Sequence, residues 1–381
     1  MTNPPKTIAE LEAAGTVTPS EFNDVPDRIA EIADEALQVP ANFVEAIDRV
    51  LAAGLYDRED IEEAFACLVG GHLLLAGPPG TGKTQLARQL AAAFDCAIVE
   101  ETANPEWSVY DIIGAAALPG SSPPYRDGIL TRAVIGCANR IVANLDTGAA
   151  PQSTWLLIDE INRAEIDRAF GPLFTALSET DSGSYTLDYR PAMPVVAIPR
   201  RFRIIATMNS FDTRFVNSMS AALRRRFGRV AILPPSNSGE ESSPQELDLA
   251  LLRADALVAG RLKRAPGSLR NAVDPYAVSM REAIGAIRVL GDHGGVPVGT
   301  AQVIDTCILL LTLIGMRGVP ADKQAFDELF DRALSSRMIS ALESDAARSR
   351  LRPTYAHAFA ERFPALSRAN KRLESFLSGN D

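Results

Sequence analysis

The sequence predicts an α/β fold with a parallel sheet, followed by an all-helical C-terminal part. Between residues 61 and 233, short apolar segments alternate with segments of helical periodicity, which is typical of parallel α/β sheets. From residue 246 onward only helical periodicity is found. We expect strands at 72–77, 96–101, 154–160, 202–209 and 229–233.

Three regions are expected along the 381 residues. Residues 1–38 are rich in Thr, Pro and Glu, which predicts an N-terminal extension that is partly flexible. Residues 39–234 begin with apolar residues at helical spacing and contain the predicted sheet. The turn formers and acidic residues of 234–244 predict a linker or surface loop, and 235–381 a helical domain. Its helices are expected near 246–264, 276–290, 301–316, 322–346 and 354–377.

The composition excludes a disordered, collagen-like or mucin-like protein. Hydrophobic residues make up 46% and charged residues 23%, as in ordinary globular proteins. The net charge is −10, which argues against a general nucleic-acid coat, although 33 of the 38 basic residues are arginine. The most apolar stretch, 303–316, contains Asp305 and predicts a buried helix. With no signal peptide pattern at the start, we expect a cytoplasmic protein without membrane association.

The strongest motif lies at residues 77–84, GPPGTGKT, which match GxxxxGK[ST] between an apolar strand and a helical segment. Glycines let backbone amides turn toward phosphate oxygens, and the following helix adds the positive end of its dipole. Lys83 can reach the terminal phosphates, and the Thr84 hydroxyl can bind Mg²⁺. The expected nucleotide-binding residues are Gly77, Pro78, Pro79, Gly80, Thr81, Gly82, Lys83, Thr84 and Gln85.

Two acidic residues follow the apolar strand WLLI, namely Asp159 and Glu160. An isolated acidic pair at a strand end is usually a solvated turn, but the phosphate-binding loop favours a Walker B strand. We expect Asp159 to hold Mg²⁺ together with Thr84, and Glu160 to polarise the attacking water.

Two further segments carry candidate residues. Asn209 ends another apolar strand, where its amide can contact the γ-phosphate or position water; alone, Asn-Ser is a turn signal. Arg224, Arg225 and Arg226 precede the last strand. Such a run is ordinarily a solvated basic face, and the sharper interpretation is an arginine finger for a neighbouring subunit's phosphates.

Taken together, GPPGTGKT, WLLIDEINRA, ATMNSFDT and ALRRRF over residues 77–227 resemble an AAA+ ATPase. The DEINRA continuation, the segments 108–120 and 125–134, and the strand-like excursion 184–199 are similar to the helix-2-insert clade, which includes MoxR-type and McrB-type ATPases. The MNSFDT and RRRF pair is most similar to McrB-type motors. The resemblance implies that Asn209 and Asp212 form the sensor pair, and that Arg225 and Arg226 reach the adjacent protomer's nucleotide.

The resemblance also implies Mg²⁺ as cofactor, ATP or GTP as substrate, and a hexameric ring that drives a partner protein. The partner would be a nuclease-type effector or a von Willebrand A-type protein. Two departures stand out. Thr300 and Ala301 occupy the place where a sensor 2 arginine is expected. Fewer than 50 residues precede the predicted motor, so we do not expect this chain to read modified DNA directly, and the sequence does not indicate direct nucleic-acid binding.

Three possible functions differ in the role of the bound nucleotide. The first is a ring-forming nucleoside triphosphatase, including a McrB-like motor of a restriction or defence system. The second is a nucleotide-gated scaffold that assembles without turnover, which leaves Glu160 without a use. The third, a monomeric P-loop kinase, explains neither RRRF nor the helical C-terminal part.

Overall fold

The computed structural model describes residues 32–117, 124–148, 151–173, 175–178, 183–190, 195–209, 225–237 and 241–379. They form two compact units. The first contains the described residues up to Ala76 and from Lys83 to Ala231, and the second contains Gly77–Gly82 and the described residues from Ile232 onward. The glycine-rich loop therefore groups with the second unit, although the strand before it and the helix after it belong to the first.

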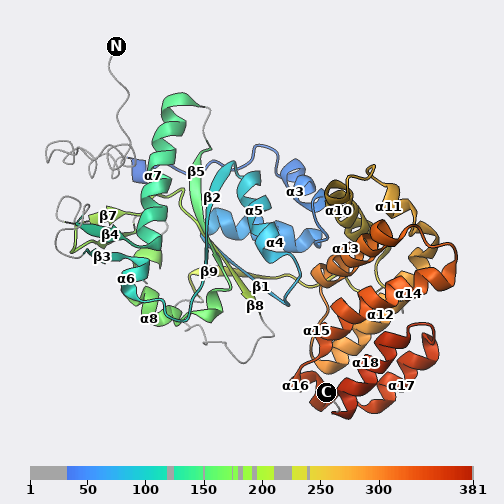
Figure 1. The fold of residues 1–381 in the computed structure, drawn as a ribbon. Helices are drawn as coiled ribbons and strands as arrows, with labels where there is room; N and C mark the ends of the chain where they lie inside the picture. Colours follow the sequence, from blue (N-terminus) through green and yellow to red (C-terminus); the bar gives the residue numbers. More distant parts are fainter. Residues whose placement is uncertain are drawn as a thin grey trace. The chain divides into compact units, whose positions relative to one another are not determined.

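The first unit is built on a parallel five-stranded sheet (Figure 1), and its strand order is β2-β5-β8-β1-β9. The predicted α/β class is confirmed, and every predicted strand is present: the strand at 72–77 has the predicted bounds, and the ends of the others differ by at most two residues. The strands are β1 (His72–Gly77), β2 (Cys96–Thr102), β5 (Ser153–Asp159), β8 (Ile204–Asn209) and β9 (Phe227–Ala231).

The central strands are buried on both faces, which explains their continuous apolar runs. Alternate residues point to opposite sides. Leu156 and Ile158 of β5 belong to a core that also contains Leu130 and Val134, whereas Trp155 packs against Phe94 on the other side. Helices cover the sheet on both sides: α3 (Phe43–Ala52), α4 (Arg58–Gly70), α5 (Lys83–Ala93), α6 (Val109–Ile112), α7 (Ile129–Thr147) and α8 (Ile166–Phe170).

Two short hairpins extend from this core and are fastened to each other. They are β3 (Gly114–Ala116) with β4 (Tyr125–Asp127), and β6 (Ser184–Thr186) with β7 (Val195–Ala197). Arg190, which is 1% exposed, pairs with Asp127 at 2.8 Å, and the Tyr189 hydroxyl donates to the Ile113 carbonyl at 2.8 Å. The guanidinium also lies over the Tyr125 ring. The hairpins fall within the segments 108–134 and 184–199 that the resemblance pointed out as inserts.

Residues 32–38, which the sequence pattern assigned to the N-terminal extension, contact the first unit. Ile32 is part of its core, and Gln38 exchanges hydrogen bonds with Gln152. Arg201 donates to the Ala36 carbonyl and pairs with Glu35. A residue far along the chain thus fixes this segment, which local composition does not reveal.

His72 lies on an inner strand of the sheet and is 3% exposed. Its Nδ1 accepts a hydrogen bond from the Ile204 amide at 3.1 Å. Burial, with help from Arg203, lowers the pKa of His72 to about 3. The side chain is therefore a neutral core acceptor.

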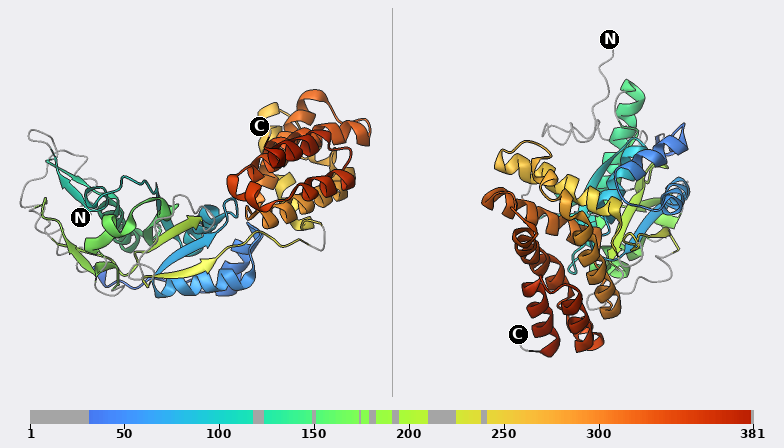
Figure 2. Two further views of the ribbon diagram at one scale, coloured as in Figure 1. Left: turned by 90° about the horizontal axis from the view of Figure 1, so that it is seen from below. Right: turned by 90° about the vertical axis from the view of Figure 1, so that its right-hand side faces the viewer.

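The second unit is helical from residue 244 onward (Figure 2), as predicted. Two long predicted helices are divided. The first, near 322–346, contains a π-helical turn at Ser335–Ile339; the second, near 354–377, breaks at Pro364, and the Asp331 carboxylate accepts the amides of Arg368 and Ala369 where the next helix starts. The helices are α10 (Pro244–Leu262), α11 (Ser268–Asn271), α12 (Ala277–Gly294), α13 (Thr300–Arg317), α14 (Lys323–Leu334), α15 (Ser340–Leu342), α16 (Asp345–Arg350), α17 (Pro353–Arg362) and α18 (Ser367–Ser378).

Helix α13 is long and apolar enough to cross a membrane by length and composition alone. One side of it, including Val303, Cys307 and Leu310, is buried in the core of the helical unit. Such a helix is also the expected centre of a helical domain. Within the predicted linker 234–244, the Glu241 carboxylate forms an ion pair with Arg281 at 3.0 Å.

Candidate functional site

The tips of β5 and β8 bring together the polar residues that follow their apolar runs. Leu156, Leu157 and Ile158 pair with 204–206, and continuing this register places Asp159 beside Thr207. The Thr207 hydroxyl donates to Asp159 Oδ1 at 2.5 Å, and the Thr84 hydroxyl donates to the same oxygen at 2.8 Å. The first turn of α5 and two strand ends thus converge on one carboxylate.

Lys83 opens α5 in the same unit and is only 6% exposed. Burial lowers the pKa of Lys83 to about 8, while Asp159 and Glu160 act in the opposite direction. A buried ammonium next to two acids is suited to meeting a polyphosphate, because the ligand's charge offsets the cost of burial.

Three hydrogen bonds hold the amide and the carboxylate of Glu160. Its backbone lies in the left-handed region (φ 52°, ψ 47°), and its amide donates to the Thr207 hydroxyl at 2.9 Å. Asn209 Nδ2 donates to Oε1 at 2.8 Å, and Arg163 Nε donates to Oε2 at 2.6 Å. Glu160 and Asn209, which were predicted separately as site residues, are therefore in direct contact.

The loop Gly77–Gly82 is described within the second unit. Gly80 and Gly82 have φ values of 79° and 83°, which residues with a Cβ rarely adopt, and the Thr81 hydroxyl donates to the Pro78 carbonyl at 3.1 Å. The Ala301 amide, in the first turn of α13, donates to the Gly80 carbonyl at 2.9 Å. A Cβ on Gly299 would lie 2.7 Å from the Pro79 carbonyl oxygen, so only glycine fits there.

A buried ion pair lies next to the place where a sensor 2 arginine was expected. Arg288 pairs with Glu246 at 2.5 Å, and the Thr300 hydroxyl donates to the same Glu246 oxygen at 2.7 Å. Arg288 also donates to the carbonyls of Val298 and Pro235. Thr300 is thus bound to an acid inside the helical unit.

The remaining predicted residues lie as follows. Gln85 is exposed on α5, Arg225 is exposed and Arg226 half-buried just before β9. Asp212 and Arg224 lie outside the described residues. The geometry of the described part therefore joins Lys83, Thr84, Asp159, Glu160 and Asn209, while the roles of the arginines stay predictions.

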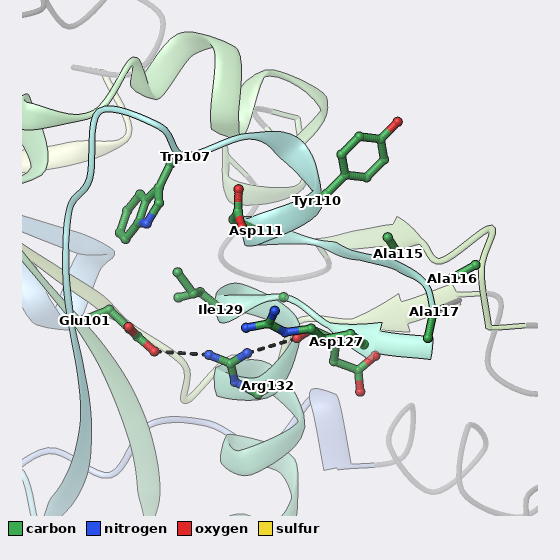
Figure 3. Close-up of a pocket in the computed structure, with 12 residues that line it drawn as sticks. Glu101, Trp107, Tyr110, Asp111, Ala115, Ala116, Ala117, Asp127, Ile129 and Arg132 are labelled. Carbon is green, nitrogen blue, oxygen red and sulfur yellow. Dashed lines mark hydrogen bonds and ion pairs between the residues drawn. The ribbon is translucent and has the colours of Figure 1, made fainter. Parts of the chain in front are cut away.

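A cavity of about 740 Å³ lies at the base of the β3–β4 hairpin (Figure 3). Trp107 and the exposed Tyr110 line one side, and Glu101, paired with Arg132 at 3.1 Å, lines another. Trp107 belongs to the core of the first unit and also lines this cavity. Its mixed charges favour no single ligand.

The donor set at the strand tips fits Mg²⁺. Magnesium prefers oxygen ligands and is usually held by one or two carboxylates together with substrate phosphates. The Thr84 hydroxyl and the Asp159 carboxylate supply such oxygens side by side. Among the described residues no group of three or more His, Cys, Asp or Glu side chains could form a cage for a metal. These two oxygen ligands therefore support a Mg²⁺ site that substrate phosphates would complete.

Sequence reasoning missed two residues of the site. Thr207 lies two positions before Asn209 and so shares its face of β8, a signal that the period of a strand could have supplied. Arg163 lies three residues after Glu160, within hydrogen-bonding reach on a helical turn. Nothing in the sequence indicated the Arg288–Glu246 pair, which joins positions 42 residues apart.

The chain was compared with protein families, curated proteins and solved structures. Residues 72–227 match the family described as AAA domain (dynein-related subfamily). A comparison with curated proteins found no match. Among solved structures, a point mutant of RuvB from Thermotoga maritima is similar with a TM-score of 0.40 and 16% identity, over 86% of this chain and 89% of that chain. Within residues 72–227, the family match and the parallel sheet correspond to an AAA+ P-loop fold, and a helical region follows in the sequence.

Proposed function

We propose that this chain is a Mg²⁺-dependent nucleoside triphosphatase that works as a ring and uses hydrolysis to remodel or drive a partner protein. The observation that carries the proposal is the convergence of Thr84, Asp159, Glu160 and Asn209 beside the buried Lys83. The AAA domain match supports nucleotide hydrolysis in general.

Each residue has a defined task in this proposal. Lys83 binds the terminal phosphates, and Thr84 and Asp159 hold the metal ion. When bound, the metal would neutralise negative charge on the phosphates. Glu160 accepts a proton from the attacking water, and Asn209 orients that water or the γ-phosphate. Thr207 fixes both acids, because it donates to Asp159 and accepts from the Glu160 amide.

We further propose that the site is completed by a neighbouring subunit. Arg225 is exposed on the described surface, and a planar guanidinium suits the charge that develops on a transferring phosphoryl group. Arg226 is the second candidate for this task. The hexameric number follows from the resemblance to the helix-2-insert ATPases.

The partner is proposed on the same resemblance. The McrB-like motifs favour a nuclease-type effector in a restriction or defence system, and the MoxR-like features favour a von Willebrand A-type protein. The hairpins β3–β4 and β6–β7 are the proposed contact region, because Arg190 and Asp127 tie them into one body that can transmit movement.

The experiment measures phosphate release from ATP and GTP over a range of protein concentrations, with and without Mg²⁺. Glu160→Gln should lower kcat by roughly 10² to 10⁴, the usual contribution of a general base. Arg225→Ala should abolish cooperative turnover, and a mixture of the two variants should regain activity because one intact interface forms. Arg229→Ala, another exposed arginine close by, serves as the control.

Two outcomes would redirect the proposal. If wild type binds nucleotide and assembles but hydrolyses neither ATP nor GTP, the nucleotide-gated scaffold replaces the motor. If activity is independent of concentration and the mixed variants regain nothing, the site is complete within one subunit.

A further inference from the structure

The ends of α10 and α13 are basic in a chain that is acidic as a whole. Residues 259–271 contain four basic residues and no acidic one, and residues 306–320 contain one basic residue and no acidic one, while the whole chain has a net charge of −10. Asp322 is the next acidic residue after them, and its carboxylate accepts the Ala325 amide at 2.8 Å as the cap of α14. The two helix ends therefore carry a local excess of positive charge.

Direct contacts join the two helix ends. Arg264 Nη2 donates to the Gly315 carbonyl at 3.3 Å. A Cβ on Gly315 would lie 2.4 Å from the Leu262 side chain, so the last turns of the two helices are closely packed. The exposed side chains on either side of this contact belong to one surface. We call it the α10–α13 corner, and its residues are Arg261, Lys263, Met316, Arg317 and Val319.

The cations of this corner have no acid to pair with in the described part of the chain. Arg261, Lys263 and Arg317 are exposed, and none of them forms an ion pair with a described residue. Arg270, by contrast, pairs with Asp248 at 3.2 Å. Cations near a helix C-terminus interact favourably with its last carbonyls, which explains why the fold tolerates them here. Their charge is left open to a partner.

Two exposed apolar side chains lie among these cations. Met316 is 73% exposed, the highest value for a large hydrophobic residue in the described part of the chain, and Val319 is 66% exposed. A single exposed apolar residue is ordinary, but two within four positions among unpaired cations form a mixed surface. Methionine is flexible and polarisable, so it packs well against irregular partner surfaces.

We propose that the α10–α13 corner is a docking surface for an acidic segment of another protein that carries an apolar side chain. Charge complementarity identifies the acids, which pair with the three cations, and the exposed Met316 and Val319 identify the apolar anchor. A nucleic-acid backbone would engage the cations alone and leave both apolar side chains in water. The corner shares no residue with the nucleotide site, so this inference does not depend on the proposed function.

The test measures binding of labelled peptides to the full chain by fluorescence anisotropy. The main probe alternates glutamate with leucine, and a second probe of the same charge alternates glutamate with glycine. Arg261→Glu combined with Lys263→Glu reverses the charge of the corner, and Met316→Ser removes the apolar anchor. The melting temperature of each variant shows that it is folded.

Matched controls lie elsewhere in the helical unit. Arg352→Glu combined with Lys371→Glu makes the same charge change at exposed cations that also form no ion pair with described residues. Val278→Ser removes an apolar side chain that is 53% exposed on α12.

The charge variant should weaken binding of the glutamate–leucine peptide by about tenfold, because it removes two exposed charge pairs and adds repulsion. Met316→Ser should weaken it by about fivefold, since part of the methionine side chain is buried in the complex. The glutamate–glycine peptide should bind wild type about fivefold more weakly for the same reason. Both controls should match wild type, and affinity should fall as salt rises.

Three outcomes would overturn the proposal. If wild type binds neither peptide, the corner is only a solvated basic end. If both peptides bind equally well and Met316→Ser has no effect, or if the control charge variant weakens binding as much as the corner variant, the attraction is general and no docking surface exists. If a DNA duplex or phosphatidylserine vesicles bind with the same dependence on Arg261 and Lys263 while the peptides do not, the partner is a nucleic acid or a membrane instead.

Discussion

Each unit of the molecule contains an arginine paired with a glutamate, and the two pairs differ in their surroundings. Arg288–Glu246 in the helical unit and Arg163–Glu160 in the α/β unit have similar N–O separations, 2.5 and 2.6 Å. The first pair is 5% and 0% exposed, the second 50% and 24%. Arg288 makes two further hydrogen bonds to carbonyls, and Glu246 accepts a second hydrogen bond from the Thr300 hydroxyl.

The difference shows how burial separates a structural pair from an adjustable one. A buried charge that loses its partner has no water to replace it, so the pair holds α10, α12 and the start of α13 together. An exposed pair opens at small cost. The same two side-chain types therefore form a buried pair that stabilises one unit and a solvent-exposed pair in the other.

The largest effect is expected from breaking the buried pair. Arg288→Met should destabilise the protein by about 3 to 5 kcal/mol, because Glu246 is left charged and buried. Denaturant unfolding followed by circular dichroism measures it. The double variant Arg288→Met with Glu246→Leu should recover much of the loss. A single-variant cost below about 1 kcal/mol would contradict the comparison.

The next effect concerns the start of α13, which the buried pair supports through Thr300. Gly299→Ala would place a Cβ 2.7 Å from the Pro79 carbonyl oxygen and 2.8 Å from the Gly80 carbonyl carbon. Overpacking of this kind costs about 1 to 3 kcal/mol, so nucleotide affinity should fall by about tenfold as the loop shifts. Gly260→Ala, where a Cβ meets open space on α10, is the control. Equal affinities for the two variants would argue against the loop contact.

The pH dependence of nucleotide binding tests the burial of Lys83. Its pKa falls from 10.5 to about 8, so in the free protein the amine is neutral above that pH while the unfolded chain stays protonated. This group therefore lowers the stability of the free protein below pH 8, and its contribution rises with pH toward 10.5.

Binding of a phosphate should restore the proton on Lys83, so affinity should be flat below pH 8 and fall above it, by at most about tenfold per pH unit. Calorimetry in buffers with different ionisation enthalpies detects the proton uptake. Lys83→Arg should show a flatter profile. Affinity that stays constant up to pH 9.5 would show that the amine is charged before binding.

The smallest effect on stability is expected from breaking the exposed ion pair. Arg163→Ala should change the free energy of unfolding by less than about 1 kcal/mol, because solvent replaces the guanidinium. The measurement is the same denaturant experiment as for Arg288→Met. A loss comparable to that of Arg288→Met would show that Arg163 is structural and that exposure does not distinguish the two pairs.

The sequence by itself determined the main helices and strands of both units and the positions of the candidate site residues at the ends of strands. Strands such as HLLLAG are continuous apolar runs because both faces of a central parallel strand are buried, and this is readable without coordinates. The loop GPPGTGKT and the acids after WLLI mark positions at strand ends, and parallel strands carry such ends to one edge. The sequence therefore allowed us to predict that Thr84 and Asp159 lie close together.

Only the tertiary structure decided which side chains meet across the chain. Arg201 holds residues 32–38, Arg288 finds Glu246, and the Ala301 amide meets the Gly80 carbonyl, although none of these partners is near in sequence. Long-range partners are chosen by packing and burial, which depend on the whole fold, whereas strand and helix periodicity are local. For the same reason, only the tertiary structure shows that Asn209 and Arg163 contact the two carboxylate oxygens of Glu160.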